Sequence, residues 1–292
     1  MNVRLNPTLR LAGFALILGA AAACAAATPA AISAAPTPAA TAVQSIEIGA
    51  ADFSYSAPDT VAAGWTRVTL KNNGQELHHM QLFRGRPGVT AQQLVDAVKA
   101  GPAEIFKIAT AEGGPGTTVP TSSTETYVDL LPGTYLLACF VSGADHAPHL
   151  AKGMTKVVIV TDPAGGSLLT APATEGSVTL KDFTIENFPG TLPPGRHIFR
   201  IVNAGPQPHE ANILQLAPGK TARDAIDFFT APAGPPPFTA VGGVQAVTPG
   251  VTDAILVVDL KLGNYLAICN IPDPTSGKPH SALGMIKEFT VK

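Results

Sequence analysis

Short apolar stretches, interrupted at regular intervals by polar residues, dominate the chain after residue 43. Segments 66–70, 127–130 and 156–160 are β-branched or alternate between apolar and polar residues, and Gly, Pro or Asn residues bound them. Alternation with a period of two places every second side chain on one face, which is typical of half-buried β-strands. The pattern therefore predicts that each half of the chain is mostly β.

One helix is predicted in each half. Apolar residues recur at helical spacing in segments 94–98 and 225–229. Each segment follows a candidate capping box, which is Thr-x-x-Gln at 90–93 and Thr-x-x-Asp at 221–224. About 120 residues of short strands, with one helix in a long connection, predict a Greek-key β-sandwich for each half.

The sequence repeats itself. Asp52-Phe53 recurs 130 positions later, and the Asn-x-Gly motif at 72–74 recurs 131 positions later. A repeat of this length predicts two homologous domains, at residues 44–162 and 175–292. The linker between them, at residues 163–174, begins with a run of turn-forming residues.

The N-terminal segment has the pattern of an export signal. Arg4 and Arg10 form a positively charged region before an apolar run at 11–23, and small residues follow this run. Residues 1–24 are therefore interpreted as a signal peptide with a candidate lipobox at Cys24, and its apolar run is expected to be removed on export. The protein is expected in the periplasm or on the extracellular face of a bacterial cell envelope.

Two cleavage sites compete at the end of this signal. Ala-Ala-Ala-Cys at 21–24 resembles a bacterial lipobox, which would attach a lipid to Cys24, whereas Ala-Ala-Ala at 25–27 satisfies the rule for ordinary signal peptidase. The Ala/Pro/Thr-rich linker at 25–43 carries no charge and suits a spacer between a membrane surface and a folded domain. The linker favours the lipid anchor, and both alternatives stay open.

Charge and hydropathy exclude two classes of partner. Charged residues make up 14% of the chain and the net charge is −2, against about 25% charged residues in an average protein. Nothing here is basic enough to bind a nucleic acid. No apolar run after Ala27 is long enough to span a bilayer. Membrane contact is expected only through the N-terminal lipid.

The two cysteines beyond the signal occupy equivalent places. Cys139 and Cys269 each end the motif Gly-x-Tyr-Leu-x-x-Cys. A disulfide would require equivalent positions of two separate sandwiches to face each other within about 7 Å, so we expect free thiols. Unpaired thiols in an exported protein need another explanation.

Histidines and methionines surround both cysteines in the same order. Pro-His-x-x-x-Gly-Met follows each cysteine, and Asn-x-Gly-x-x-x-His precedes it. Each half thus has one His, one Cys, a second His and one Met as candidate metal ligands. These are His78, Cys139, His149 and Met154 in the first half, and His209, Cys269, His280 and Met285 in the second.

These motifs resemble those of the cupredoxins, the blue type 1 copper proteins, and in particular the plastocyanin- and azurin-like members. The resemblance covers residues 45–291 and implies two tandem cupredoxin-like Greek-key β-sandwiches, each with a short helix in a long connection. It implies up to two copper ions per chain, held by the eight ligands named above. It also implies that Asn72 and Asn203 pin the ligand loops by hydrogen bonds. A His₂-Cys site with a weak axial Met accepts both Cu(I) and Cu(II).

The resemblance favours an electron carrier over an enzyme. Multicopper oxidases need several His-x-His pairs, and the sequence contains none. Nitrite reductases of the family have a histidine directly before the copper cysteine, where this chain has Ala138 and Ile268. The expected partners are redox proteins or membrane electron-transport components. The alternatives are a protein of copper delivery or storage, and a metal-free binding sandwich.

Three other histidines are assigned lesser roles. His79 follows a ligand and aligns with Glu210, so we expect it to point away from the site, towards the surface. His146 lies in the ligand loop and could compete as a ligand. His197 aligns with Thr66 and is expected to be incidental.

Overall fold

The computed structural model describes residues 43–143, 145–163, 170–231 and 234–292. Cys24, the segment interpreted as a signal peptide and nearly all of the 25–43 linker lie outside these ranges. The described residues belong to one compact unit. Among them, no helix has the length and the hydrophobicity that crossing a bilayer would need.

The first half consists mainly of β-strands. Its helices are α1 (Ala91–Ala100), α2 (Pro102–Ile108) and the 3-10 turn η1 (His149–Lys152). Its strands are β1 (Gln44–Ala51), β2 (Ser54–Ser56), β3 (Thr60–Ala62), β4 (Gly64–Asn72), β5 (Gln81–Gly85), β6 (Ala109–Ala111), β7 (Pro115–Thr117), β8 (Ser123–Leu130), β9 (Gly133–Ala138) and β10 (Thr155–Thr161).

The second half repeats this order with one helix and one strand fewer. Its helices are α3 (Ala222–Thr230) and the 3-10 turn η2 (His280–Leu283). Its strands are β11 (Gly176–Lys181), β12 (Thr184–Glu186), β13 (Thr191–Leu192), β14 (Gly195–Asn203), β15 (His209–Leu216), β16 (Phe238–Val247), β17 (Ala254–Leu260), β18 (Gly263–Ile268) and β19 (Ile286–Val291).

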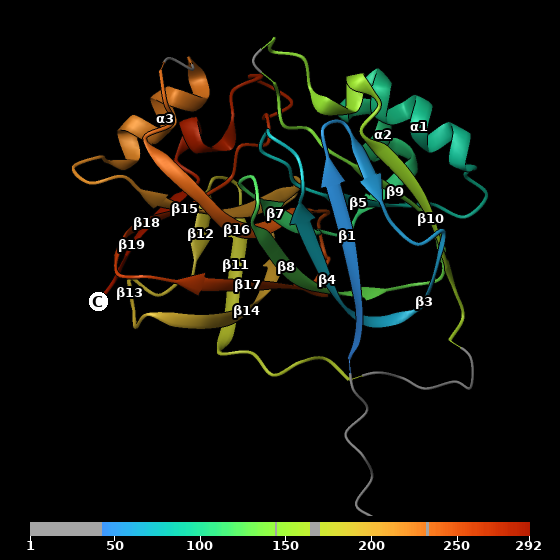
Figure 1. The fold of residues 1–292 in the computed structure, drawn as a ribbon, viewed down its shortest axis with the longest axis horizontal. Coiled ribbons are helices and arrows are strands. Elements are labelled where there is room, and N and C mark those ends of the chain that lie inside the picture. Colours follow the sequence, from blue (N-terminus) through green and yellow to red (C-terminus); the bar gives the residue numbers. More distant parts are fainter. Residues whose placement is uncertain (1–42, 144, 164–169, 232–233) are drawn as a thin grey trace, which may run out of the picture. The chain divides into compact units, whose positions relative to one another are not determined.

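Each half is a sandwich of two mixed sheets. In one sheet, β1 runs parallel to β4 and β11 runs parallel to β14 (Figure 1). In the other sheet, β3 pairs in parallel with β10, and β13 with β19. The chain crosses from sheet to sheet several times in each half, as Greek-key connections require. The predicted fold of two tandem all-β sandwiches is confirmed.

The predicted helices begin at the predicted capping boxes. Thr90 accepts a hydrogen bond from the Gln93 backbone N–H, and the Gln93 side chain accepts one from Thr90. Thr221 and Asp224 make the same pair of bonds at the start of α3. The first half has a second helix, α2, that we did not predict. It starts at Pro102, directly after Gly101 ends α1, because proline suits the first turn of a helix.

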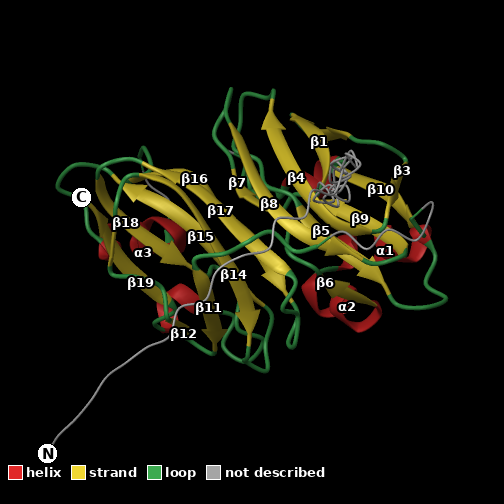
Figure 2. Cartoon of the chain, turned by 90° about the horizontal axis from the view of Figure 1, so that it is seen from below, coloured by secondary structure: helices red, strands yellow, loops and turns green. Residues whose placement is uncertain are grey.

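Two of the three sheets contain strands from both halves. Strand β8 of the first half pairs antiparallel with β17 of the second, so one sheet of eight strands runs through both halves. Strand β7 belongs to the first half by sequence, but it pairs with β16 and forms the edge of a sheet of the second half. Figure 2 shows β7 and β8 beside β16 and β17. Buried polar side chains lie along this junction.

Candidate metal centres

Three of the predicted ligands converge in the first half. His78 lies in the loop after β4, Cys139 directly follows β9, and His149 opens η1. Nδ1 of His149 lies 3.1 Å from Nδ1 of His78 and 3.6 Å from Sγ of Cys139. All three residues are buried, and their ligand atoms lie within 4.8 Å of one another. The strands of one sandwich therefore bring together residues that are far apart in the sequence.

The second half repeats this cluster. His209 opens β15, Cys269 directly follows β18, and His280 opens η2. Nδ1 of His280 lies 3.1 Å from Nδ1 of His209 and 3.4 Å from Sγ of Cys269. These three residues are also buried, with their ligand atoms within 4.8 Å of one another. The repeat in the sequence is thus a repeat in side-chain geometry.

The two methionines are tied to the ligands through the backbone. Met154 is fully buried, its N–H donates to the His149 carbonyl at 3.0 Å, and its carbonyl accepts from the Cys139 N–H at 3.3 Å. Met285 makes the corresponding bonds. Before Met154, Gly153 ends η1 at a φ of 101°, a left-handed conformation that favours glycine. This turn explains the Gly-Met spacing, and axial ligation by the methionines stays a prediction.

Asn72 and Asn203 fasten the loops that carry the first histidine of each site. Nδ2 of Asn72 donates to the carbonyls of Glu76 at 2.8 Å and Thr118 at 3.0 Å, and Oδ1 accepts from the Gly74 N–H at 2.9 Å. Asn203 makes the three corresponding bonds in the second half. Both asparagines thus fix the loop between a strand end and a ligand histidine.

In the first site, carboxylates hold the outer nitrogen of each imidazole. Nε2 of His78 lies 2.8 Å from Oδ1 of Asp52, and Nε2 of His149 lies 2.9 Å from Oε2 of Glu76. An ionised carboxylate only accepts hydrogen bonds, so each Nε2 carries the proton and each Nδ1 keeps its lone pair. The carboxylate partners thus determine which ring nitrogen of each histidine carries the proton.

In the second site, one of the two partners is an amide. Nε2 of His209 lies 2.7 Å from Oδ1 of Asp182, and Nε2 of His280 lies 2.9 Å from Oε1 of Gln207. Nε2 of Gln207 donates to Asp273 at 3.1 Å, which turns the amide oxygen of Gln207 towards His280. The imidazoles of the second site therefore also carry their protons on Nε2. Only one of them has a carboxylate as its partner, whereas both do in the first site.

These contacts leave two Nδ1 lone pairs facing each other in each site. Burial lowers the pKa of His78 and His209, and lowers the pKa of His280 to about 4. Two Nδ1 lone pairs 3.1 Å apart repel each other unless a cation lies where they meet. The sites are thus arranged for a metal ion.

The cysteines are buried thiols that need a cation to ionise. Burial raises the pKa of Cys139 to about 11 and raises the pKa of Cys269 well above its usual value. The cysteines are free, as predicted. A metal ion would replace the thiol proton and compensate the buried negative charge.

The donor atoms fit a metal with nitrogen and sulfur ligands. Metal bonds of about 2.0 Å to imidazole and about 2.3 Å to thiolate, at trigonal to tetrahedral angles, place neighbouring donors roughly 3 to 4 Å apart. The observed separations of 3.1, 3.4 and 3.6 Å lie in this range. A soft thiolate beside two imidazoles suits copper, as the resemblance implied.

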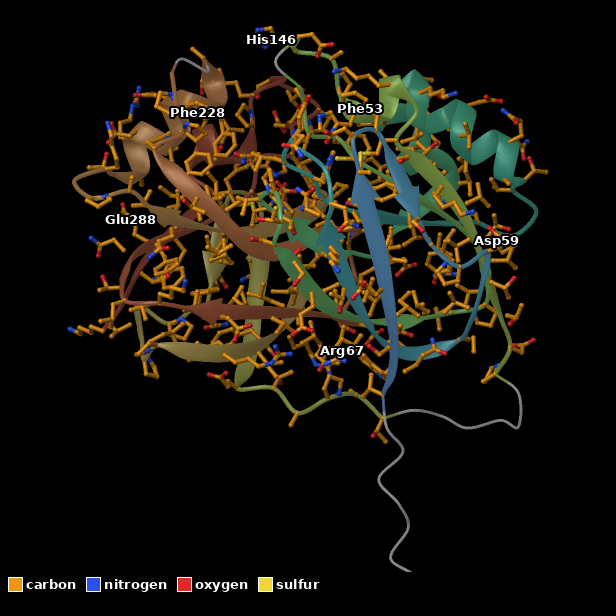
Figure 3. All side chains as sticks on the ribbon, in the orientation of Figure 1. Phe53, Asp59, Arg67, His146, Phe228 and Glu288 are labelled. Atoms are coloured by element: carbon orange, nitrogen blue, oxygen red, sulfur yellow. The ribbon has the colours of Figure 1, made fainter. Side chains whose placement is uncertain are left out.

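Aromatic side chains cover the second histidine of each site. The ring of Phe53 meets His149 edge-on with centroids 5.0 Å apart, and Phe183 meets His280 in the same way at 5.1 Å. The ammonium group of Lys152 lies 4.3 Å above the Phe53 ring. Figure 3 labels Phe53 on the first half. The imidazoles are therefore separated from solvent.

His79 is buried, so its expected place at the surface is wrong. Its side chain points away from the ligand cluster, as the alternation predicted, but that side faces the second half of the chain. The Phe140 N–H donates to Nε2 of His79 at 2.6 Å, and Nδ1 contacts Gln245 of the second half. Glu210, at the equivalent position, is also buried and accepts from the Asn270 N–H at 2.9 Å.

The other two histidines lie outside the clusters. His146 is exposed at the outer end of its loop and does not belong to the ligand group of the first half (Figure 3). His197 is buried and lies 2.9 Å from Glu175 and 2.8 Å from the Pro193 carbonyl. Neither histidine contacts a predicted ligand.

Sequence reasoning missed the residues that hold the imidazoles. Asp52-Phe53 and Asp182-Phe183 recur at the repeat offset, and this recurrence was the signal available for a role at the site. No such signal marks Glu76, because Gln207 replaces it in the second half. The shared role of Glu76 and Gln207 becomes visible only in the structure, where each side chain contacts the second histidine of its own half.

Comparison with known proteins finds relatives among solved structures. No protein-family model and no curated protein matches the chain. Dithionite-reduced auracyanin from the photosynthetic bacterium Roseiflexus castenholzii is 24% identical over 41% of this chain and 98% of its own, with a TM-score of 0.28. Auracyanin A, a "blue" copper protein from Chloroflexus aurantiacus, is 22% identical over 40% and 98%, with a TM-score of 0.27.

A multicopper oxidase matches a larger part of the chain. It is 17% identical over 85% of this chain and 88% of its own, with a TM-score of 0.26. The fold of both halves is cupredoxin-like, as the strand order and the repeated ligand clusters indicate.

Proposed function

We propose that this protein is an exported electron carrier with one type 1 copper site in each half. His78, Cys139, His149 and Met154 hold one ion, and their four equivalents in the second half hold the other. The observation that carries the proposal is the pair of imidazole Nδ1 atoms 3.1 Å apart beside a buried thiol, which occurs in both halves. Bound copper would supply a one-electron couple at each site.

The surrounding residues favour a site that changes little between two oxidation states. Carboxylate or amide partners orient each imidazole, and backbone hydrogen bonds join the cysteine, histidine and methionine segments. Such outer contacts fix the orientation of the ligands. A fixed ligand set keeps the reorganisation small when an electron arrives, which suits a carrier.

The covered imidazoles favour a carrier over an enzyme. Phe53 and Phe183 pack on the second histidines, and all four ligand histidines are buried, which leaves little room for a substrate at either ion. Among the described residues, His, Cys, Asp and Glu form two groups of three or more that could hold a metal, and these are the two clusters above. We therefore infer a protein that exchanges electrons with redox proteins or membrane electron-transport components.

The N-terminal segment supports a place outside the cytoplasm. Residues 1–24 have the pattern of a signal peptide, and the lipobox-like sequence before Cys24 supports a lipid anchor. The 25–43 linker would then tether the two sandwiches to a membrane surface.

Copper loading with a redox cycle tests this function. Purified protein is titrated with Cu(II), and then reduced and reoxidised while its visible absorbance is recorded. We expect an intense blue colour that bleaches with one electron per copper and returns on oxidation. Colourless binding, or copper that consumes oxygen or nitrite in turnover, would contradict the proposal.

A further inference from the structure

Four polar side chains lie buried in a row between the two halves. His79 and Glu210 directly follow the first histidine ligand of their own halves, while Asn212 lies in β15 and Gln245 in β16. Each of the four is at least nine-tenths buried. Burying polar groups is costly unless each one is hydrogen-bonded. Their presence at a junction that apolar residues could fill calls for a functional reason.

The hydrogen bonds in this row have defined directions. The Phe140 N–H donates to Nε2 of His79, so the ring proton is on Nδ1, which donates to Oε1 of Gln245. Nε2 of Gln245 then donates to Oδ1 of Asn212 at 3.1 Å. Glu210 precedes Asn212 by two residues on β15, so the backbone of this strand connects Glu210 to the other three residues. We call these four residues the interface relay.

Both ends of the relay reach a ligand cysteine. The side chain of His79 accepts a hydrogen bond from the N–H of Phe140, the residue that follows Cys139. The side chain of Glu210 accepts one from the N–H of Asn270, the residue that follows Cys269. Covalent bonds and hydrogen bonds thus run without a gap from one sulfur to the other.

We propose that the interface relay couples the two cysteines electronically, so that one electron passes between the halves inside the molecule. The inference rests on the proposed function, because it requires a redox ion in each half. With copper bound in both halves, one ion would be oxidised from Cu(I) to Cu(II), and the other would take up the same electron and be reduced from Cu(II) to Cu(I). No bond to hydrogen breaks, because every donor and acceptor of the relay keeps its partner.

The surroundings of the sites favour this route. An electron tunnels more readily through covalent bonds and hydrogen bonds than across a gap between atoms. The histidine ligands are covered by Phe53 and Phe183 and by their carboxylate or amide partners. The cysteines, by contrast, are each followed by a residue whose N–H donates to a member of the relay. The relay makes the chain a carrier of two electrons that share one internal path.

The test compares electron redistribution with and without the relay. Met285→Gln serves as the parent, because a changed axial ligand distinguishes the second site in potential and in absorbance. One electron is injected by pulse radiolysis into fully oxidised protein. We expect a redistribution phase between the two absorption bands whose rate does not depend on protein concentration.

Gln245→Met removes both side-chain hydrogen bonds in the middle of the relay and keeps the length of the side chain. It should lose the redistribution phase while both sites still take up copper. Gln81→Met is the matched control, because Gln81 is buried at the same junction and donates to the Ala246 carbonyl, but does not belong to the relay. Asn212→Leu breaks the relay at its next member, should Gln245→Met fold poorly. Redistribution at the parent's rate in the relay variants, or no such phase in the parent, would overturn the proposal.

A measurement without copper separates this inference from the proposed function. In metal-free protein labelled with ¹⁵N-histidine, the His79 ring should carry its proton on Nδ1, and this proton should be protected from exchange. Gln245→Met should remove that protection, and Gln81→Met should keep it. An unprotected Nδ1 proton in the wild type rejects the relay, whereas a protein with an intact relay and no blue copper rejects the proposed function.

Discussion

The two copper sites should differ in reduction potential, because Glu76 and Gln207 place different groups next to the second histidine of each site. Glu76 places a carboxylate 2.9 Å from Nε2 of His149, where Gln207 places a neutral amide 2.9 Å from Nε2 of His280. A negative charge stabilises the oxidised ion more than the reduced ion, since the oxidised ion carries one more positive charge. Glu76→Gln should therefore raise the potential of the first site, and Gln207→Glu should lower that of the second.

The size of the shift follows from Coulomb's law. The imidazole ring and one metal bond separate the carboxylate from the ion, so the charges lie roughly 7 Å apart. The Glu76 side chain is 35% exposed, so the effective dielectric constant lies between about 20 and about 80. The interaction is then about 0.6 to 2.4 kcal/mol. A value of about 1 kcal/mol corresponds to about 40 mV for a one-electron couple.

Redox titration of copper-loaded protein, followed by visible absorbance, measures both potentials. Glu104→Gln is the control, because it removes the same charge from an exposed ion pair with Lys107 in α2 and should shift neither potential. The reciprocal variants should shift the two sites in opposite directions. A fall in the first potential in Glu76→Gln, or equal shifts in the Glu104 control, would refute this reasoning.

Three further predictions concern the second site, turnover and the anchor. Gly205→Ala would place a Cβ atom 2.7 Å from Nε2 of His209 and so weaken copper binding in the second half about 10- to 100-fold, whereas Gly190→Ala, with nothing near its Cβ position, should bind normally in a copper titration. Copper-loaded protein should consume neither oxygen nor nitrite, and turnover that disappears in Cys139→Ser would reverse the assignment as a carrier. If Cys24 is lipidated, a fatty-acid label should mark the protein, and Cys24→Ser should release it from membranes; unlabelled, freely soluble wild type would exclude the anchor.

The ligand clusters could be predicted because each one lies within a single repeat. His78, Cys139 and His149 recur in the same order in the second half, and the two histidines are 71 residues apart in both halves. The Gly-Met ending reflects the left-handed turn that closes η1. The capping boxes were predictable for a similar reason, since Thr90 and Thr221 act on residues three positions away. Local signals and repeated signals were thus enough for the sandwiches and the clusters.

The junction between the halves could not be predicted from the same signals. Successive side chains of a strand point to opposite faces, so the sequence predicts that His79 points away from His78. This alternation does not predict whether solvent or another domain lies on that side. Strand β7 pairs with β16, which depends on how two complete sandwiches meet. The interface relay also draws Asn212 and Gln245 from positions with no chemical motif. Such contacts appear only once the tertiary structure is known.

Copper counting in single-cysteine variants tests the central claim most directly. Cys139→Ser, Cys269→Ser and the double variant are each loaded with Cu(II), and bound copper and blue absorbance are measured against the wild type. Because the ligands of each cluster come from one half, we predict two blue sites in the wild type, one in each single variant and none in the double variant. A single variant that lost all blue colour, or a wild type with one blue copper, would contradict the claim of one site per half.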